Sequence, residues 1–290
     1  MPPRPLDHLV LPVTDIRTAR ARLTRLGFTV AADARHPFGT ENACVFFKDK
    51  SYLEPLGVAS EEECVAAIKA GNQFVARNAA YRFRNGPEGL SGIVMGSDDG
   101  DGDDAAFRAA GISAGEQLQF SRRMKFPDGN EITATFKLSF AADLRAPEFH
   151  AFTCQRINVP PADRSALEAH ANGVTGIKSV VLTEHEPVEF APFLEEVIGQ
   201  PAMERNRGGI DIVSRNAEIQ VLDKEGAHDY LRIDMPAERG LRGRAIVFSV
   251  ESLAKTEALL LGNGVTMMRH NGMLLVPAEP GQGVLMGFWE

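Results

Sequence analysis

Two polar side chains that can ligate a metal lie in strand-like stretches of the sequence. His8 follows Asp7 in front of the apolar run Leu9–Val13, and Glu54 lies inside Tyr52–Leu56. A carboxylate buried in a strand costs free energy unless it is paired or bound to a metal. His8 and Glu54 therefore suggest one divalent-metal site, built from the first and last strands of a single strand–helix–three-strand unit.

The elements that must position these side chains are indicated by apolar periodicity and turn residues. Thr14 or Asp15 can cap a first helix, and Gly27 can end it. The segment 35–42 is expected to be a loop, because it contains a proline and a glycine. The expected strand, helix and three further strands are Leu6–Val13, Ile16–Leu26, Phe28–Ala32, Ala43–Phe47 and Tyr52–Leu56.

The same order of elements returns three times along the chain. The second copy begins at Leu90, the third at Ile177 and the fourth at Arg244. Such internal repetition predicts an α+β fold built from four βαβββ modules. Between the modules, residues 157–172 are expected to form a linking helix.

We expect two domains. Residues 1–172 would form the first, with two modules and a helical insertion near 57–88, and residues 173–290 a second, degenerate pair of modules.

Composition narrows the class of protein. The net charge of −8 argues against a nucleic-acid partner. No apolar run approaches the roughly 20 residues that span a bilayer, and the first residues show no secretory signal. The three cysteines form no CxxC pair. Neither a disulfide framework nor a membrane partner is therefore expected, and a reducing cytoplasm fits best.

The chain resembles the vicinal oxygen chelate superfamily, and within it the glyoxalase-like domain proteins. Leu6–Val10, His36–Asn42, Tyr52–Glu54 and His170–Gly173 carry the resemblance. It implies that modules pair into cups of strands, so that the four modules form two cup-shaped mixed sheets. It also implies that the first and fourth strands of a module hold a divalent metal, which a small-molecule substrate chelates through neighbouring oxygens.

Carried over residue by residue, the resemblance assigns His8 and Glu54 to the ligand positions of the first module. In the second module these positions fall at Gly92, which offers no ligand, and at His150. The expected metal ligands are therefore His8, Glu54 and His150. In the third module the matching positions are Lys178 and Gln220, and in the fourth they are Ala245 and Gly287. These residues make no believable set of metal ligands. The second pair of modules would therefore be structural, or would form a pocket without metal.

Each candidate ligand also has a structural interpretation. His8 would then be a histidine that bonds the backbone at a strand start. Glu54 would be a surface carboxylate on an edge strand. His150 would be a histidine packed among phenylalanines. The sequence leaves these alternatives open.

Other residues are expected to contact the substrate or to act on it. His36 is a candidate base, although its loop has a shaping proline and glycine of its own. Thr40 and Asn42 are candidate hydrogen-bond donors to substrate oxygens, although both are common turn residues. Tyr52 and Phe152 are candidate aromatic contacts of the substrate.

The sequence also contains an acidic run, a cluster of basic residues and a further histidine, His170. The acidic run 96–104 lacks the EF-hand pattern and is expected to be a solvated loop before a helix. Arg122, Arg123 and Lys125 lie on a hairpin around residues 127–130 and suggest an anionic substrate. Alternation places Arg122 on the face opposite the other two. His170 is expected to be structural.

The leading hypothesis is a metal-dependent lyase or isomerase of the glyoxalase type. Its ion, Zn, Mn, Fe, Ni or Co, would stabilise an enolate-type intermediate after His36 or Glu54 removes a proton. Two histidines and a carboxylate also suit a non-haem iron extradiol-type dioxygenase. The missing ligand at Gly92 favours a third alternative, a metal-free small-molecule binding or resistance protein. A structural interaction module without a deep pocket is a fourth, and both monomer and homodimer remain open.

Overall fold

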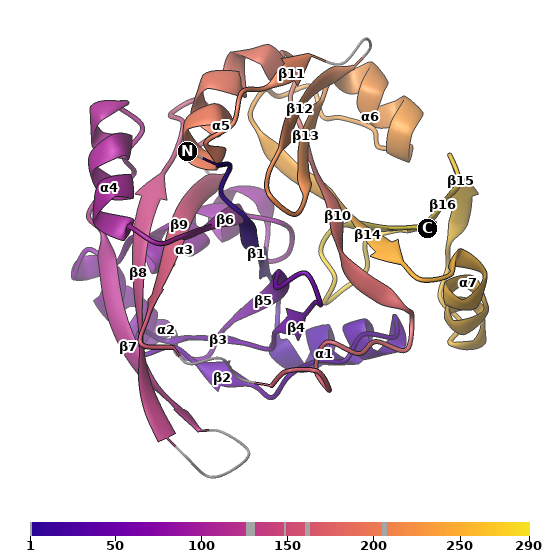
Figure 1. The fold of residues 1–290 in the computed structure, drawn as a ribbon, viewed down its shortest axis with the longest axis horizontal. Helices are drawn as coiled ribbons and strands as arrows, with labels where there is room; N and C mark the ends of the chain where they lie inside the picture. The colour runs from indigo at the N-terminus through magenta and orange to yellow at the C-terminus, as the bar shows by residue number, and fades with distance from the viewer. Residues whose placement is uncertain (1, 126–130, 148, 160–162, 205–207) are drawn as a thin grey trace.

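The strands of the protein form two curled mixed sheets that lie side by side (Figure 1). The structure is a computed structural model, and it describes residues 2–125, 131–147, 149–159, 163–204 and 208–290. The hairpin turn expected at 127–130 lies outside these residues. None of the helices in the described ranges has the length and apolar character needed to cross a membrane.

The first sheet has β1 and β6 at its centre. Its strand order is β2-β3-β5-β1-β6-β9-β8-β7, and β4 pairs with β5. β1 runs parallel to β5 and antiparallel to β6. The strands are β1 (Leu6–Pro12), β2 (Ala34–Arg35), β3 (Thr40–Asn42), β4 (Val45–Phe46), β5 (Tyr52–Val58), β6 (Gly92–Ser97), β7 (Leu118–Lys125), β8 (Glu131–Ala141) and β9 (His150–Ile157).

The second sheet repeats this plan. Its order is β11-β12-β13-β10-β14-β17-β16-β15, and β10 is parallel to β13 and antiparallel to β14. The strands are β10 (Val174–Thr183), β11 (Met203–Glu204), β12 (Gly209–Val213), β13 (Glu218–Leu222), β14 (Arg242–Val250), β15 (Met268–His270), β16 (Met273–Val276) and β17 (Leu285–Trp289).

In the described residues one helix follows the first strand of each unit, and three further helices lie between units. The first unit has four strands after its helix, β2 to β5, rather than the three that were expected. The unit helices are α1 (Ile16–Arg25), α4 (Gly100–Ala109), α5 (Ala191–Ile198, after the 3-10 turn Pro187–Phe190) and α7 (Leu253–Gly262). The others are α2 (Glu61–Lys69), α3 (Gln73–Asn85) and α6 (Lys224–Leu231). Asp15 caps α1 by accepting from the Thr18 N–H, and Asp99, in the acidic run, caps α4 in the same way.

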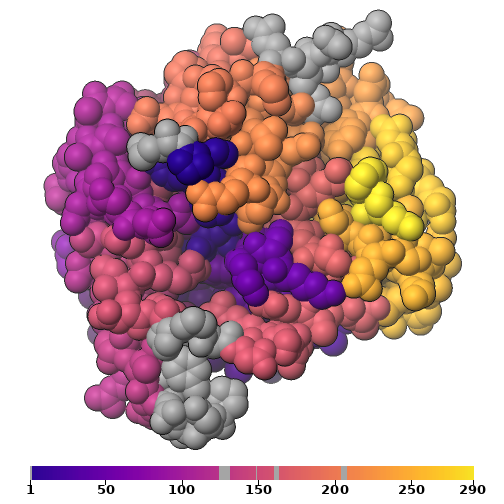
Figure 2. All heavy atoms as spheres, viewed as in Figure 1, coloured from indigo at the N-terminus to yellow at the C-terminus, as the bar shows by residue number. Residues whose placement is uncertain are grey.

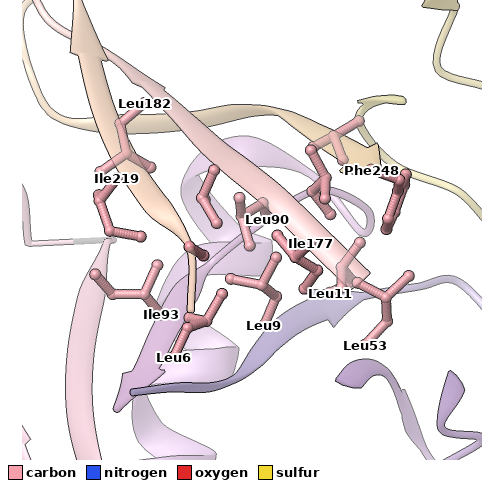
Figure 3. Close-up of a cluster of buried hydrophobic side chains, with 14 of the residues drawn as sticks. Leu6, Leu9, Leu11, Leu53, Leu90, Ile93, Ile177, Leu182, Ile219 and Phe248 are labelled. Carbon is pink, nitrogen blue, oxygen red and sulfur yellow. The ribbon is translucent and has the colours of Figure 1, made fainter. Parts of the chain in front are cut away.

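One apolar core joins the two sheets. Leu9 from the first sheet and Ile177, Ile219 and Phe248 from the second belong to the same buried cluster, and Figure 3 shows these side chains turned toward one another. The N-terminal segment also ties the sheets. In Figure 2 it lies, in indigo, between the magenta and orange parts of the chain, where Arg4 donates to the carbonyls of α5.

A helix of the chain itself, α6, packs against the concave side of the second sheet. Ala227 and Leu231 of α6 are fully buried and belong to one apolar cluster with Val181, Ala245 and Val247 of β10 and β14. α6 was not expected from the sequence. Its apolar face occupies the region where the last two modules would have carried ligands.

The expected α+β class with two cup-shaped mixed sheets is confirmed. The domain boundary at 172/173 stays a prediction. It coincides with the start of β10, but the core is continuous across it.

Three local expectations were wrong. Residues 28–32 form no strand, because Phe28 packs into the core against Phe47 and Phe248 instead. The expected loop 35–42 is instead a short β2–β3 hairpin, closed by the His36 N–H on the Thr40 carbonyl. The described residues of the expected linking helix 157–172 form no helix, since Ile157 ends β9 and residues 163–172 form turns and irregular backbone.

Long-range bonds replace that helix. The Thr29 N–H donates to His170 Nδ1 at 3.0 Å, and His170 Nε2 donates to the Phe46 carbonyl at 2.9 Å. His170 therefore fastens the segment to the first module, which is the structural role expected for it.

Candidate functional site

The candidate site begins with the pairing of β1 and β5. His8 lies opposite Tyr52, and Val10 lies opposite Glu54, so all four side chains share one face of the sheet. His8 and Glu54 are buried, and His8 Nε2 lies 3.6 Å from Glu54 Oε2. The structure thus brings together the two residues that the sequence singled out first.

Asp7 fixes the orientation of the His8 ring. His8 Nδ1 donates to Asp7 Oδ1 at 2.6 Å, which leaves the lone pair of Nε2 facing Glu54. A carboxylate behind a histidine in this way is the usual support of a metal-binding imidazole. The pairing of β1 with β6 has a register shift between Leu6 and His8. In this irregular stretch the side chains of the adjacent residues Asp7 and His8 contact each other.

Arg156 on β9 holds Asp7 from the other side. Its Nη2 donates to Asp7 Oδ1 at 2.7 Å, and its Nη1 bonds the other carboxylate oxygen. Burial opposes ionisation of Asp7, but the positive charge of Arg156 and the hydrogen bonds from His8 and Arg156 outweigh it and hold the pKa of Asp7 well below its usual range. Asp7 is therefore an anion behind His8.

The β2–β3 hairpin brings His36 and Asn42 to the other side of Glu54. Asn42 Nδ2 donates to Glu54 Oε1 at 2.6 Å, and His36 Nε2 lies 3.6 Å from the same oxygen. His36 Nδ1 lies 2.9 Å from the Thr40 hydroxyl. Burial lowers the pKa of His36, and Arg122 lowers it further against the opposite effect of Glu54. The His36 ring is therefore neutral near pH 7.

Thr40 differs from its expected place. It is fully buried behind His36, and it is not among the residues that line the pocket. Its expected substrate contact stays a prediction, but its visible contact is with the His36 ring. Asn42, Tyr52 and Phe152 do line the pocket.

Aromatic rings form the walls of the pocket. Tyr52 stacks on His8 with ring centroids 4.4 Å apart, and Phe152 meets the same ring edge-on at 5.8 Å. Further rings line the pocket: Phe38, Phe46, Phe74, Phe120 and Phe136. Burial raises the pKa of Cys154 to about 12 and also raises that of Cys44, so these lining cysteines are neutral thiols.

His150 lies farther from the centre of the site. It begins β9 opposite Gly92, where an added Cβ would come within 3.1 Å of His150 Nε2, and its ring stacks on Phe152 at 5.7 Å. His150 is not among the pocket-lining residues. The glycine expected to lack a ligand thus makes room for this imidazole.

The donor atoms of His8, His36 and Glu54 decide whether the site can hold a metal ion. Within the described ranges no group of three or more His, Cys, Asp or Glu side chains already has an arrangement that would hold one. Two donors do fit: His8 Nε2 and Glu54 Oε2 are 3.6 Å apart, close to the roughly 3–3.5 Å between adjacent ligands about 2.1 Å from one ion. His36 Nε2 is at the same distance from the other oxygen of Glu54.

Sequence reasoning missed the Asp7–Arg156 pair and Arg164, which also lines the pocket. One signal was present for Arg156. Strand alternation places it on the face of Phe152 and Cys154. Nothing local marks Arg164, which lies in the segment that was expected to be helical.

Comparisons with known proteins agree on the fold. A family model described as a glyoxalase-like domain matches residues 6–198, more than half of the chain. No curated protein matches the sequence.

Three solved structures resemble the whole chain. A hypothetical protein from Staphylococcus aureus has a TM-score of 0.66 at 11% identity, over 98% of this chain and 98% of its own. A triple mutant of 4-hydroxymandelate synthase from Streptomyces coelicolor has 0.61 at 14% identity, over 99% and 92%. A Mn(II)-bound glyoxalase from Novosphingobium aromaticivorans has 0.56 at 10% identity, over 99% and 82%. At these identities the likeness shows the fold alone.

Proposed function

Because this chain belongs to the glyoxalase-like domain family, we propose that it is a metal-dependent lyase or isomerase acting on a small oxygen-chelating substrate. His8 Nε2 and Glu54 would hold the divalent ion; His150, the third ligand expected from the sequence, does not line this pocket. Imidazole and carboxylate suit Zn, Mn, Fe, Ni or Co, and Mn(II) is bound by a glyoxalase of similar fold. A bound ion supplies Lewis-acid stabilisation of the anion formed when the substrate loses a proton.

The observation that carries this proposal is the row Arg156–Asp7–His8–Glu54. An ionised carboxylate fixes the proton of His8 on Nδ1, so that Nε2 presents a lone pair beside a second carboxylate.

His36 is the base in this proposal. Its ring is neutral, and Nε2 faces the carboxylate end of the pocket. The contact of Nδ1 with Thr40 holds the ring in place. His36 Nε2 would take the proton from the carbon beside the substrate carbonyl, and Asn42 keeps Glu54 oriented meanwhile.

Metal content tests the proposal directly. Purified wild-type protein, dialysed against Mn(II), Zn(II), Ni(II), Co(II) or, without oxygen, Fe(II), should retain about one ion per chain by plasma mass spectrometry. His8→Ala and Glu54→Ala should lose it, with unchanged far-UV circular dichroism. The control His185→Ala, whose ring bonds the Pro236 carbonyl in the second sheet, should retain it. Wild-type protein that takes up none of these ions would rule the proposal out.

A dioxygenase is the second candidate, favoured by one observation. His8 and His36 both lie 3.6 Å from oxygens of Glu54, and two histidines with one carboxylate form the facial triad of non-haem iron oxygenases. His36→Ala separates the two candidates. Loss of metal makes His36 a ligand, whereas retained metal makes it the base. Oxygen uptake with Fe(II) and a catechol provides the activity test.

A metal-free binding protein is the remaining alternative. It predicts a pocket that takes up a small molecule without any ion. We further propose a cytoplasmic location, where the three buried cysteines would stay free thiols as they are here. A monomer or homodimer with a small-molecule substrate, and without nucleic-acid or membrane partners, completes the proposal.

A further inference from the structure

The pocket is positively charged, although the chain carries a net charge of −8. Three arginines line it, Arg122, Arg156 and Arg164, and Glu54 is the only acidic residue among its described lining. Asp7 neutralises Arg156. Arg122 and Arg164 therefore outnumber Glu54 and leave the described lining with a net positive charge.

Arg122 is the better placed of the two. It lies on β7, with its guanidinium over the Phe136 ring at 5.3 Å. Its Nε is buried and finds no hydrogen-bond partner among the described residues. A buried guanidinium N–H without a partner costs free energy, which a bound anion would recover. Arg122 and His36 line the same pocket.

Arg164 stands at another part of the same lining. Its guanidinium lies over the Phe46 ring at 4.4 Å, and no ion pair holds it within the described part of the chain. The lining that these arginines share with the His8–Glu54 pair is mainly aromatic, and Phe38, Phe74 and Phe120 surround the His36 ring.

We propose that the pocket takes a flat, apolar or aromatic acid, with its neighbouring oxygens at the His8–Glu54 end and its carboxylate on Arg122. This inference rests on the proposed function, which supplies the chelating end. Arg122 provides two parallel N–H donors that match a carboxylate, and Arg164 adds positive charge to the same lining. The phenylalanines contact the faces and edges of the ring.

Matched probes test the carboxylate end alone. 3,4-Dihydroxybenzoate and its longer homologue 3,4-dihydroxyphenylacetate carry vicinal oxygens and a carboxylate. 3,4-Dihydroxybenzamide keeps the oxygens and the ring without the charge. Calorimetry with Mn(II)-loaded wild-type protein should show that at least one of the two acids binds ten times more tightly than the amide, or better.

Variants identify the arginine responsible. Arg122→Met should remove the preference for the acid and leave amide binding unchanged, whereas Arg122→Lys should retain part of it. Arg123→Met is the matched control, because Arg123 is the next residue on the same strand, is exposed and does not line the pocket. It should bind the probes as the wild type does.

The outcomes separate this inference from the proposed function. Ion binding that depends on His8, together with equal affinity for acids and amide, overturns the inference and leaves the function intact. An acid preference that survives in Arg122→Met also overturns it. An acid preference lost in Arg122→Met supports it, even in a protein that binds no ion, where the proposed function would fail instead.

Discussion

Removing the charge of Asp7 should weaken metal binding without unfolding the protein. Asp7→Asn keeps an oxygen that can accept from His8 Nδ1, but it removes the negative charge that lies 2.6 Å from that nitrogen. The pKa of Asp7 is held well below its usual range, so at pH 7 the substitution removes a full charge. His8 Nε2 then becomes a weaker base and a poorer ligand.

The expected magnitude follows from the role of such supporting carboxylates. Their loss typically weakens metal affinity about 10- to 100-fold, which is about 1.4 to 2.7 kcal/mol. The stability cost should be smaller, because Arg156 is 32% exposed and water can solvate the guanidinium that loses its partner. A competition titration against a chelator with known metal affinity measures the dissociation constant.

Asp103→Asn is the matched control. Asp103 is a buried aspartate that pairs with Arg4 at 2.7 Å, and it is not among the residues that line the pocket. It should lose stability to a similar degree and keep its metal affinity. If Asp7→Asn binds the ion as tightly as the wild type does, the tautomer argument and the assignment of His8 as a ligand both fail.

Two predictions concern stability. Burial opposes ionisation of Glu184, but Arg239 and neighbouring N–H groups lower its pKa to about 2. This folded-state pKa lies below the unfolded value of about 4.3, so the stabilisation is present above pH 5 and lost as pH falls toward 2. Glu184→Gln should therefore lower the free energy of unfolding by about 1 to 2 kcal/mol at pH 7, a value that allows for the exposed guanidinium of Arg239, and should change nothing near pH 2. Urea titrations at the two pH values measure this difference, and an equal loss at both would contradict it. Leu9→Ala should lower the free energy of unfolding by about 2 to 5 kcal/mol. Because the two sheets share a core, the urea transition seen by fluorescence of Trp289 in the second sheet should shift together with the transition seen by circular dichroism. A Trp289 transition that stays in place would show that the sheets unfold separately.

The sequence alone placed the two residues that begin the site. Alternation in Leu6–Pro12 and Tyr52–Val58 put His8 and Glu54 in strands, and Asp15 capped the helix as foreseen. These signals are local, since periodicity and capping depend on residues a few positions apart. The repeated unit was visible for the same reason.

Local signals failed where distant contacts decide the backbone. Phe28 has the apolar neighbours of a strand, yet it turns into an aromatic core shared with the second sheet. The segment before His170 follows a helix-like pattern, yet its bonds to Thr29 and Phe46 hold it in turns. Tertiary context overrides weak intrinsic propensity in such segments.

The sequence by itself determined the family, most of the element order, and the placement of His8 and Glu54 in strands; the β1–β5 register then put them on one face. Only the tertiary structure decided which charges stand behind and across from them. Arg156 reaches Asp7, and Arg122 reaches the cavity, through strand pairings and sheet curvature that no local pattern encodes. Register between strands far apart in sequence is settled by burial of the common core, so the electrostatics of the pocket emerge only once the sheet has closed.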